Sequence, residues 1–230
     1  MLPSNLPNEG LFITRKRKKW KFAHFDSYPN CFNFERGDNS ETLKKALAAV
    51  LPLQNKGLIV EVAAGNAQFS LELARRNPQI NFVAIDIKSD RLYTSAKQAL
   101  AERVENIVFL RMHVNELSKV FAPSSVNEIW LTFPDPFPRD RSAKHRLSHS
   151  NFLRQYRSIL KDTGRLHFKT DNRGLFLWSL EQFVAEKWML TELSFDLHES
   201  GLPDDYKIMT HYEQRFTAEG IPTNIVTAQP

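Results

Sequence analysis

A carboxylate held between two prolines is the most chemically informative feature of this sequence. Asp135 follows Pro134 and precedes Pro136, directly after the apolar run 129–133. Each proline fixes its own φ at about −65° and pushes the residue before it towards extended geometry, so both neighbours restrict where the Asp135 carboxylate can point. A stiff carboxylate at a strand end, beside cationic side chains, suits a planar base carried on a phosphate backbone. A proline-rich turn before a basic helix is the structural alternative.

Two basic runs accompany this carboxylate in the sequence. The first follows Pro138 and comprises Arg139, Arg141, Lys144, His145 and Arg146. The second places six basic residues within positions 15–21, interrupted only by Trp20. We expect the first run to form a cationic surface and the second to form an arm that lies on phosphates, with Trp20 stacking on a base. A solvated tail is the alternative for the arm.

The first two predicted strands end in features of a nucleotide-binding site. Strand 58–63 runs into the turn 61–67 (Glu-Val-Ala-Ala-Gly-Asn-Ala), and the next strand ends at Asp86. The Asp86 carboxylate can accept from both hydroxyls of an adenosine ribose, or it can cap the following helix. Glu61 places an anion beside the turn, which repels a pyrophosphate and attracts an ammonium or sulfonium group. Because the turn also lacks Gly-x-Gly-x-x-Gly, we favour S-adenosylmethionine over NAD; a structural ion pair is the alternative role of Glu61.

Three blocks of the chain resemble the bacterial tRNA (guanine-N7)-methyltransferases. Residues 131–147 are similar to the Asp-Pro-Trp-Pro-Lys signature of that family, with Phe137 in place of Trp and Arg139 in place of Lys. Residues 167–180 (beginning His-Phe-Lys-Thr-Asp-Asn-Arg) and 208–216 (Ile-Met-Thr-His-Tyr-Glu-Gln-Arg-Phe) resemble two further blocks. The blocks occur in the family's order and with compatible spacing, between Gly57 and Pro222.

The resemblance implies an S-adenosylmethionine-dependent enzyme that methylates N7 of a guanosine in the tRNA variable loop. It places the cofactor on Glu61, Gly65, Asp86, His113, Asn115 and Asp135. It places the substrate on Arg139, Asp171, Thr210, His211, Tyr212 and Glu213. This chain departs from the family at the turn, where Ala63 and Ala67 replace the outer glycines of Gly-x-Gly-x-Gly. The family also has an acidic residue at position 113, so we expect His113 or Asn115 to accept from the adenine amino group.

Methylation of guanine N7 requires positioning rather than a strong base. N7 has a lone pair at neutral pH and no proton that must leave first, so the reaction is an in-line displacement at the methyl carbon. The product ring gains positive charge, which a carboxylate stabilises, and a carboxylate can also accept from guanine N1–H and the amine. We assign this catalytic role to Asp135, with Asp171 or Glu213 holding another part of the nucleotide. Helix capping is the alternative for Asp171.

From Gly57 onward, strand and helix patterns alternate along the chain. We expect strands at 58–63, 80–85, 107–112, 126–133 and 165–170, and helices at 66–76, 89–103, 149–160 and 175–187. Such alternation predicts an α/β fold with a doubly wound, mostly parallel sheet, as in Rossmann-like class I methyltransferases. Segments 189–197 and 208–216 are predicted to close the sheet as an antiparallel pair. In a strand, Thr210 and Tyr212 would face one side and His211 and Glu213 the other.

We divide the chain into a basic arm with an aromatic-rich extension, 1–39, and a methyltransferase domain, 40–230. The aromatic residues of 21–38 are expected to pack on that domain, and a helix is expected from Ser40 to Leu51. The histidines His24, His149, His167 and His198 show no metal-ligand spacing, so no metal is expected.

The composition fits this interpretation. The 230 residues include 42% hydrophobic residues and 17 Phe, enough for a substantial core. The net charge of +5 favours an anionic partner, nucleic acid before membrane. One cysteine and no apolar leader segment indicate a cytoplasmic protein. The sequence leaves open whether it is a monomer or a homodimer. The competing hypotheses are a non-catalytic RNA-binding protein whose degenerate turn holds no cofactor, and a methyltransferase acting on another nucleic acid or a small molecule.

Overall fold

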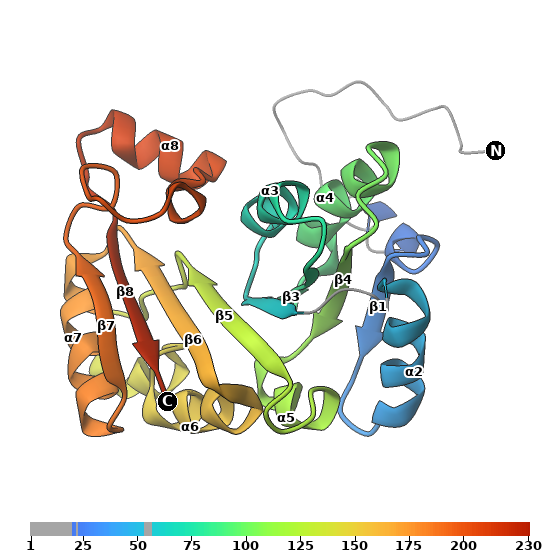
Figure 1. Ribbon diagram of the computed structural model, residues 1–230, viewed down its shortest axis with the longest axis horizontal. Helices are drawn as coiled ribbons and strands as arrows, with labels where there is room; N and C mark the ends of the chain where they lie inside the picture. Colours follow the sequence, from blue (N-terminus) through green and yellow to red (C-terminus); the bar gives the residue numbers. More distant parts are fainter. Residues whose placement is uncertain (1–19, 22, 53–56) are drawn as a thin grey trace.

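The computed structural model describes residues 20, 21, 23–52 and 57–230 (Figure 1). Their strands form one eight-stranded sheet in the order β1-β4-β3-β2-β5-β6-β8-β7. The strands are β1 (Cys31–Phe34), β2 (Leu58–Val62), β3 (Asn81–Asp86), β4 (Ile107–Met112), β5 (Val126–Thr132), β6 (Leu160–Thr170), β7 (Met189–Ser194) and β8 (Asn224–Gln229). The helices are α2 (Ser40–Val50), α3 (Gln68–Arg76), α4 (Ser89–Ala101), α5 (Leu117–Val120), α6 (Ser150–Ile159), α7 (Arg173–Ala185) and α8 (His211–Ala218). Short 3₁₀ turns are η1 (Val114–Glu116), η2 (Asp140–His145) and η3 (Asp204–Lys207).

The sheet confirms the predicted fold class. Strands β1 to β6 pair in parallel, whereas β8 is antiparallel to both β6 and β7. All parallel strands therefore present their carboxyl ends at the same edge, where ligands of doubly wound sheets bind. The strands predicted between residues 58 and 133 agree with β2 to β5 to within one residue at each end.

The strands are buried because helices cover both faces of the sheet. One face carries α2, α5, α6 and α7, with Val60, Val62, Leu153 and Phe176 in a single apolar cluster. The other face carries α3 and α4 in a second cluster. Successive residues of a strand point to opposite faces, so Glu61 lies on the α3 side, between Val60 and Val62. Among the described helices, none is long and apolar enough to cross a membrane.

The predicted strand at 208–216 is wrong, because this segment forms helix α8. Its N-cap is Thr210, whose side chain accepts a hydrogen bond from the backbone N–H of Glu213 at 3.1 Å. Thr-x-x-Glu is the sequence signature of a helix start, and the apolar residues Ile208, Tyr212 and Phe216 have the four-residue spacing of one helix face. The strand that closes the sheet is β8, at residues 224–229, a segment for which the sequence pattern predicts no strand.

The aromatic-rich extension packs on the domain, as expected. Phe25 is fully buried in the cluster beneath α3 and α4, and β1 adds a parallel strand beside β4. The basic positions 15–19 lie outside the described residues. Trp20 is described: its ring stacks on His24 at 4.1 Å between centroids and meets the edge of Tyr93. Stacking of Trp20 on a base stays a prediction, as does the division of the chain at residue 39.

Candidate functional site

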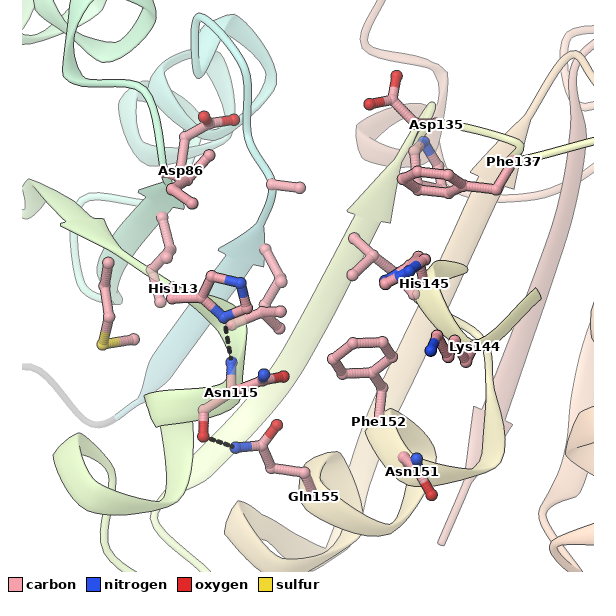
Figure 2. Close-up of a pocket in the computed structure, with 18 of the residues that line it drawn as sticks. Asp86, His113, Asn115, Asp135, Phe137, Lys144, His145, Asn151, Phe152 and Gln155 are labelled. Atoms are coloured by element: carbon pink, nitrogen blue, oxygen red, sulfur yellow. Dashed lines mark hydrogen bonds between the residues drawn. The ribbon is translucent and has the colours of Figure 1, made fainter. Parts of the chain in front are cut away.

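A cavity of about 940 Å³ opens at the carboxyl ends of β2, β3, β4 and β5 (Figure 2). Its walls come from the residues that follow these strands and from one side of α6. Figure 2 shows Asp86 and Asp135 on opposite sides of this space, with His113 and Phe152 below them in the view. Of the residues predicted at the cofactor, the cavity brings together Asp86, His113, Asn115 and Asp135.

The turn after β2 has the left-handed backbone angles of a glycine-rich loop, although alanine occupies two of the three positions. Ala63, Gly65 and Ala67 have φ of 56°, 57° and 56°, in the left-handed region. Glycine adopts this conformation freely, whereas a Cβ makes it unfavourable. The turn is held in place because Ala64 N–H donates to Ile85 O at 2.8 Å and Ala67 N–H donates to Ala64 O at 2.7 Å. The two alanines therefore preserve the loop geometry at an energetic cost.

The Asp86 carboxylate fixes this turn to the end of β3. Its Oδ2 accepts from Gly65 N–H and its Oδ1 from Lys88 N–H, both at 2.8 Å. Burial raises the pKa of Asp86, although these two hydrogen bonds counteract the effect. A carboxylate oxygen has two lone pairs, so each oxygen can accept one more donor from the cavity. Asp86 is not the N-cap of α4, since Lys88 holds that position, but Asp86 fixes the backbone just before the helix and keeps acceptor capacity on both oxygens.

The end of β4 supplies a mixed polar and apolar wall. His113 is the N-cap of η1, and its Nδ1 accepts from Asn115 N–H at 3.2 Å. The carbonyl of Asn115 in turn accepts from Gln155 Nε2 at 3.0 Å, which ties this wall to α6 (Figure 2). Apolar side chains complete the wall: Ile87, Met112, Val114 and Phe152. Ile87 is 54% exposed, so its side chain is open to the cavity.

The loop after β5 carries Asp135 on a strained and anchored backbone. Phe133 and Phe137, on either side of the Pro-Asp-Pro segment, have φ of 50° and 42°, which bulky residues rarely adopt. The guanidinium of Arg146 donates to Phe137 O from Nε at 3.3 Å and from Nη2 at 3.1 Å. The same guanidinium lies 4.5 Å from the ring centre of Trp178 on α7. Asp135 is therefore exposed at the cavity but belongs to a loop with defined supports.

One member of the predicted basic surface is not on the surface. Arg146 is only 8% exposed, because it is used in anchoring the loop. The expectation that it contributes to a cationic surface is wrong. The four other residues of the run, Arg139, Arg141, Lys144 and His145, are exposed, and Lys144 and His145 line the cavity. They lie in or beside the 3₁₀ turn η2. The alternative interpretation of this segment, a proline-rich turn before a basic helix, expected an α-helix here.

Helix α8 brings Tyr212 close to Asp171, which is predicted at the substrate, and to Asp135, which is predicted to be catalytic. Figure 1 shows this helix beyond the carboxyl ends of the parallel strands. The Tyr212 ring is 5.5 Å from Phe133 between centroids, and its pKa is raised by burial and by the nearby carboxylates of Asp171 and Asp135. Burial likewise raises the pKa of the Asp171 carboxyl. Tyr212 is 50% exposed, so the group can contact a ligand. The helix cap next to Asp171 is supplied by Asn172, not by Asp171.

Glu213, also predicted at the substrate, faces the protein interior. It is 0% exposed and pairs with the equally buried Lys169 of β6 at 2.9 Å. The Lys169 ammonium also donates to the carbonyls of Tyr206 and Ile208 at 2.9 and 3.0 Å, and burial lowers its pKa. Glu213 accepts in addition from Thr223 Oγ1 at 3.2 Å. This buried pair fixes α8 to the sheet, while Thr210 caps the helix and His211 is exposed on its first turn.

Glu61, predicted at the cofactor, does not line the cavity. Its carboxylate is buried and accepts from Ser70 of α3 and from Thr132 of β5, with both hydroxyl oxygens 2.5 Å away. Burial is the main cause that raises the pKa of Glu61 to about 7. Thr132 is the last residue of β5 before the Asp135 loop. Glu61 thus connects the start of α3 with the base of that loop.

Sequence reasoning missed two residues that support the site, Arg146 as a loop anchor and Lys169 as the partner of Glu213. A buried lysine carries no local sequence signal, since Lys169 stands in an ordinary strand pattern. The Thr-x-x-Glu signature could have located the start of α8. Within the described part of the chain, no group of three or more potential metal ligands occurs.

Comparisons with known proteins agree with this geometry. A family model described as "Putative methyltransferase" matches residues 55–224. The tRNA (guanine-N(7)-)-methyltransferase of Brevibacillus brevis is 39% identical over 166 residues, covering 72% of this chain and 77% of the relative. The enzyme of the same name from Bacillus subtilis is 39% identical over 163 residues, covering 71% of this chain and 76% of the relative.

Solved structures resemble the fold of this chain at low sequence identity. The 16S rRNA methyltransferase KamB superimposes with a TM-score of 0.61 at 15% identity, covering 85% of this chain and 94% of that chain. The 16S rRNA (adenine(1408)-N(1))-methyltransferase from Catenulisporales acidiphilia has a TM-score of 0.57 at 13% identity, covering 85% and 95%. At this identity the similarity concerns the fold.

Proposed function

Since this chain belongs to the family of tRNA (guanine-N(7)-)-methyltransferases, we propose that it transfers a methyl group from S-adenosylmethionine to N7 of a guanosine in tRNA. The observation that carries the proposal is the placement of Asp86 and Asp135 on opposite walls of one cavity, at the carboxyl ends of the parallel strands. One carboxylate is suited to a ribose and the other to a guanine. A tRNA substrate also implies a cytoplasmic location.

The residues around Asp86 fit the cofactor. Asp86 has acceptor capacity left for the two ribose hydroxyls, since its hydrogen bonds to the turn use only one lone pair on each oxygen. The base attached to that ribose falls at the end of the neighbouring strand β4, where Ile87, Met112 and Phe152 offer apolar contact. The left-handed turn at 63–67 allows the methionine part to approach the backbone. When bound, S-adenosylmethionine supplies the electrophilic methyl group.

In our proposal Glu61 supports this site indirectly, without contacting the cofactor. It contacts Ser70 and Thr132 rather than the cavity, so it positions the turn and the Asp135 loop relative to each other. The family resemblance alone would make Glu61 a direct ligand of the cofactor. A role in positioning agrees better with its complete burial.

The chemistry assigned to the protein is orientation and charge stabilisation. The lone pair of guanine N7 forms the bond to the methyl carbon, the carbon–sulfur bond breaks with its electron pair on sulfur, and no proton is lost. The guanine ring becomes positively charged, and the Asp135 carboxylate stabilises that charge while accepting from N1–H and the exocyclic amine. The loop anchors at Phe137 and Arg146 hold Asp135 ready for this contact.

The substrate side is built from exposed cations and from α8. Arg139, Arg141 and Lys144 supply phosphate contacts beside the cavity. Asp171 and Tyr212, close to each other and to Asp135, hold the target nucleotide, and the family resemblance places that nucleotide in the variable loop. In the same proposal Thr210 and Glu213 act indirectly, by capping and anchoring the helix that carries Tyr212.

A methyl-transfer assay tests the proposal. The protein is incubated with S-adenosylmethionine labelled in the methyl group and with unmodified tRNA, and the digested nucleosides are separated. We expect label in 7-methylguanosine, and mapping of the modified position should find it in the variable loop. Label in another nucleoside would replace the substrate assignment. An absence of label together with an absence of cofactor binding by calorimetry would favour the non-catalytic RNA-binding alternative.

A further inference from the structure

His113 presents a hydrogen-bond donor to the cavity. Its Nδ1 accepts from the backbone N–H of Asn115, because the side chain caps the turn η1. A neutral imidazole has one acceptor nitrogen and one protonated nitrogen, and the contact made by one determines the state of the other. With Nδ1 used as the acceptor, the proton is on Nε2. Figure 2 shows this second nitrogen on the cavity side of the ring, away from Asn115.

The neighbouring amide side chains, those of Asn115 and Gln155, each carry both hydrogen-bond donors and an acceptor. The amide side chain of Asn115 lines the same wall but carries both a donor and an acceptor. Gln155 also lines it, and its Nε2 is engaged with the carbonyl of Asn115. The backbone of Asn115 therefore orients both side chains, Gln155 through Nε2 and His113 through Nδ1, and its contact with His113 leaves that ring with a donor at Nε2.

We propose that His113 donates a hydrogen bond from Nε2 to an acceptor atom on the cofactor base. This site therefore does not select the 6-amino group of adenine. This inference rests on the proposed cofactor. Adenine offers ring nitrogens as acceptors beside its amino donor, and hypoxanthine offers the oxygen O6 at the position of the amine. A donor on the protein is compatible with both bases. A carboxylate at position 113 would accept from the amine and repel O6. The expectation that His113 accepts from the adenine amine is thereby reversed.

Two substitutions of His113 that have nearly the same shape separate the effect of hydrogen-bonding polarity from the effect of side-chain packing. Asp and Asn are both good helix caps, so His113→Asp and His113→Asn each keep an oxygen that accepts from Asn115 N–H. In the Asp variant the second oxygen offers an acceptor to the cavity, whereas in the Asn variant the amide offers a donor. Thermal melts establish that both proteins are folded.

The experiment is calorimetric titration of the wild-type protein and both variants with S-adenosylhomocysteine and with its inosine analogue. We expect the wild type and His113→Asn to bind the two ligands with affinities within about threefold. His113→Asp should favour the adenosine ligand by at least about tenfold more than the wild type does, as expected for one misplaced polar group.

Two outcomes overturn the inference in different ways. Equal ligand ratios for the Asp and Asn variants, or a wild type that rejects the inosine ligand as strongly as His113→Asp, would show that His113 does not set the polarity. No binding of either ligand to any of the three folded proteins would remove the cofactor assignment itself, and this inference with it.

Discussion

Asp135 is the side chain on which the proposed chemistry depends. Asp135→Asn retains the size of the side chain and the backbone imposed by the two prolines, but removes the charge and presents donors to guanine N1–H and the amine. We expect methylation to fall by at least ~100-fold, as when one preorganised electrostatic interaction is removed. Steady-state kinetics with labelled cofactor measure the effect, and a thermal melt checks folding. A near-normal kcat in the folded variant would move the role to Asp171.

Asp171→Asn is the matched comparison for this variant. Asp171 is half-buried next to Tyr212 and does not line the cavity, so it is expected to hold the nucleotide rather than to act on the reacting ring. Its replacement should mainly raise the KM for tRNA, with a smaller change in kcat. The two Asp→Asn variants thus separate binding from chemistry by which kinetic constant each one changes.

Glu61 makes the stability of the protein depend on pH. Its pKa is raised from 4.5 to about 7, so between these values the folded protein binds a proton that the unfolded chain has released. Stability therefore falls as pH rises through this window, by up to about 1.4 kcal/mol per pH unit. Glu61→Gln keeps the hydrogen bonds to Ser70 and Thr132 and should remove this slope. Denaturant unfolding at pH 5, 6, 7 and 8 compares the two proteins, and parallel profiles would contradict the prediction.

Several site residues could be recognised from the sequence because their chemistry is local. Asp86 and Asp135 each follow an apolar strand, and the carboxyl ends of parallel strands meet at one edge. The orientation of Glu213 and Arg146 could not be predicted in the same way. Glu213 pairs with the buried Lys169, 44 residues earlier in the chain, and Arg146 contacts the ring of Trp178, 32 residues later, so the role of each depends on contacts that its residue type does not reveal.

At the scale of elements, the turn after β2 retains a conformation that its alanines disfavour. Ala63→Gly should stabilise the protein by about 1 kcal/mol, because Ala63 has a φ of 56° and its exposed methyl makes no buried packing. This corresponds to a rise in Tm of about 2–4 °C for a chain of this size. Ala67→Gly should have little net effect, since its buried methyl is removed as the strain is relieved.

Ala64→Gly is the control within the same turn. Ala64 is buried and does not have a positive φ, so glycine removes a buried methyl and adds conformational entropy to the unfolded chain, and both effects should lower the Tm. Differential scanning calorimetry of the three variants gives the comparison. If Ala63→Gly and Ala64→Gly shift the Tm in the same direction, backbone strain at residue 63 does not limit stability.

The loop that carries Asp135 is expected to depend on Arg146 through geometry rather than through charge. Arg146→Lys keeps the positive charge but removes the paired donors to Phe137 O and the planar stacking on Trp178. We expect kcat to fall by about tenfold while the salt dependence of tRNA binding is unchanged. Arg141→Ala, at an exposed position, should do the opposite and reduce the salt slope by about 1. If Arg146→Lys and Arg141→Ala change the salt slope equally, Arg146 contacts tRNA phosphate and its role as a loop anchor is contradicted.

The strands and the longer helices between residues 58 and 159 could be predicted closely because their patterns are regular, whereas the short α5 and the 3₁₀ turns η1 and η2 are not predicted. Helix α8 is missed although its local signals are present: Ile208, Tyr212 and Phe216 are spaced by four residues, as on one face of a helix, and Thr210 starts a Thr-x-x-Glu signature. Strand β8 is missed although Ile225, Val226 and Thr227 are β-branched and every residue from 224 to 228 is buried. The long-range contacts of Glu213 with β6, in contrast, have no local signal.

At the scale of the whole molecule, the arm is the part expected to act on tRNA away from the cavity. Deleting residues 1–19 removes five basic side chains and retains Trp20, which packs on His24 and Tyr93. The logarithmic salt slope of tRNA binding should become shallower, by about 0.9 for each phosphate that the arm no longer neutralises. Affinity for S-adenosylhomocysteine should hardly change. An unaltered salt slope would mean that the arm is a solvated tail.

The position of β8 has a consequence for the time at which the protein becomes active. β8 lies between β6 and β7 and pairs with both, although it follows every other described element along the chain. On the ribosome, the cavity walls contributed by residues 62–158 emerge first, whereas β7 must wait for residues 224–229 before it has a neighbour in the sheet. Helix α8 is synthesised within the same interval. If the proposed function is correct, we expect the walls of the cofactor cavity to be synthesised before α8 and β8, so the substrate side of the site should be completed last.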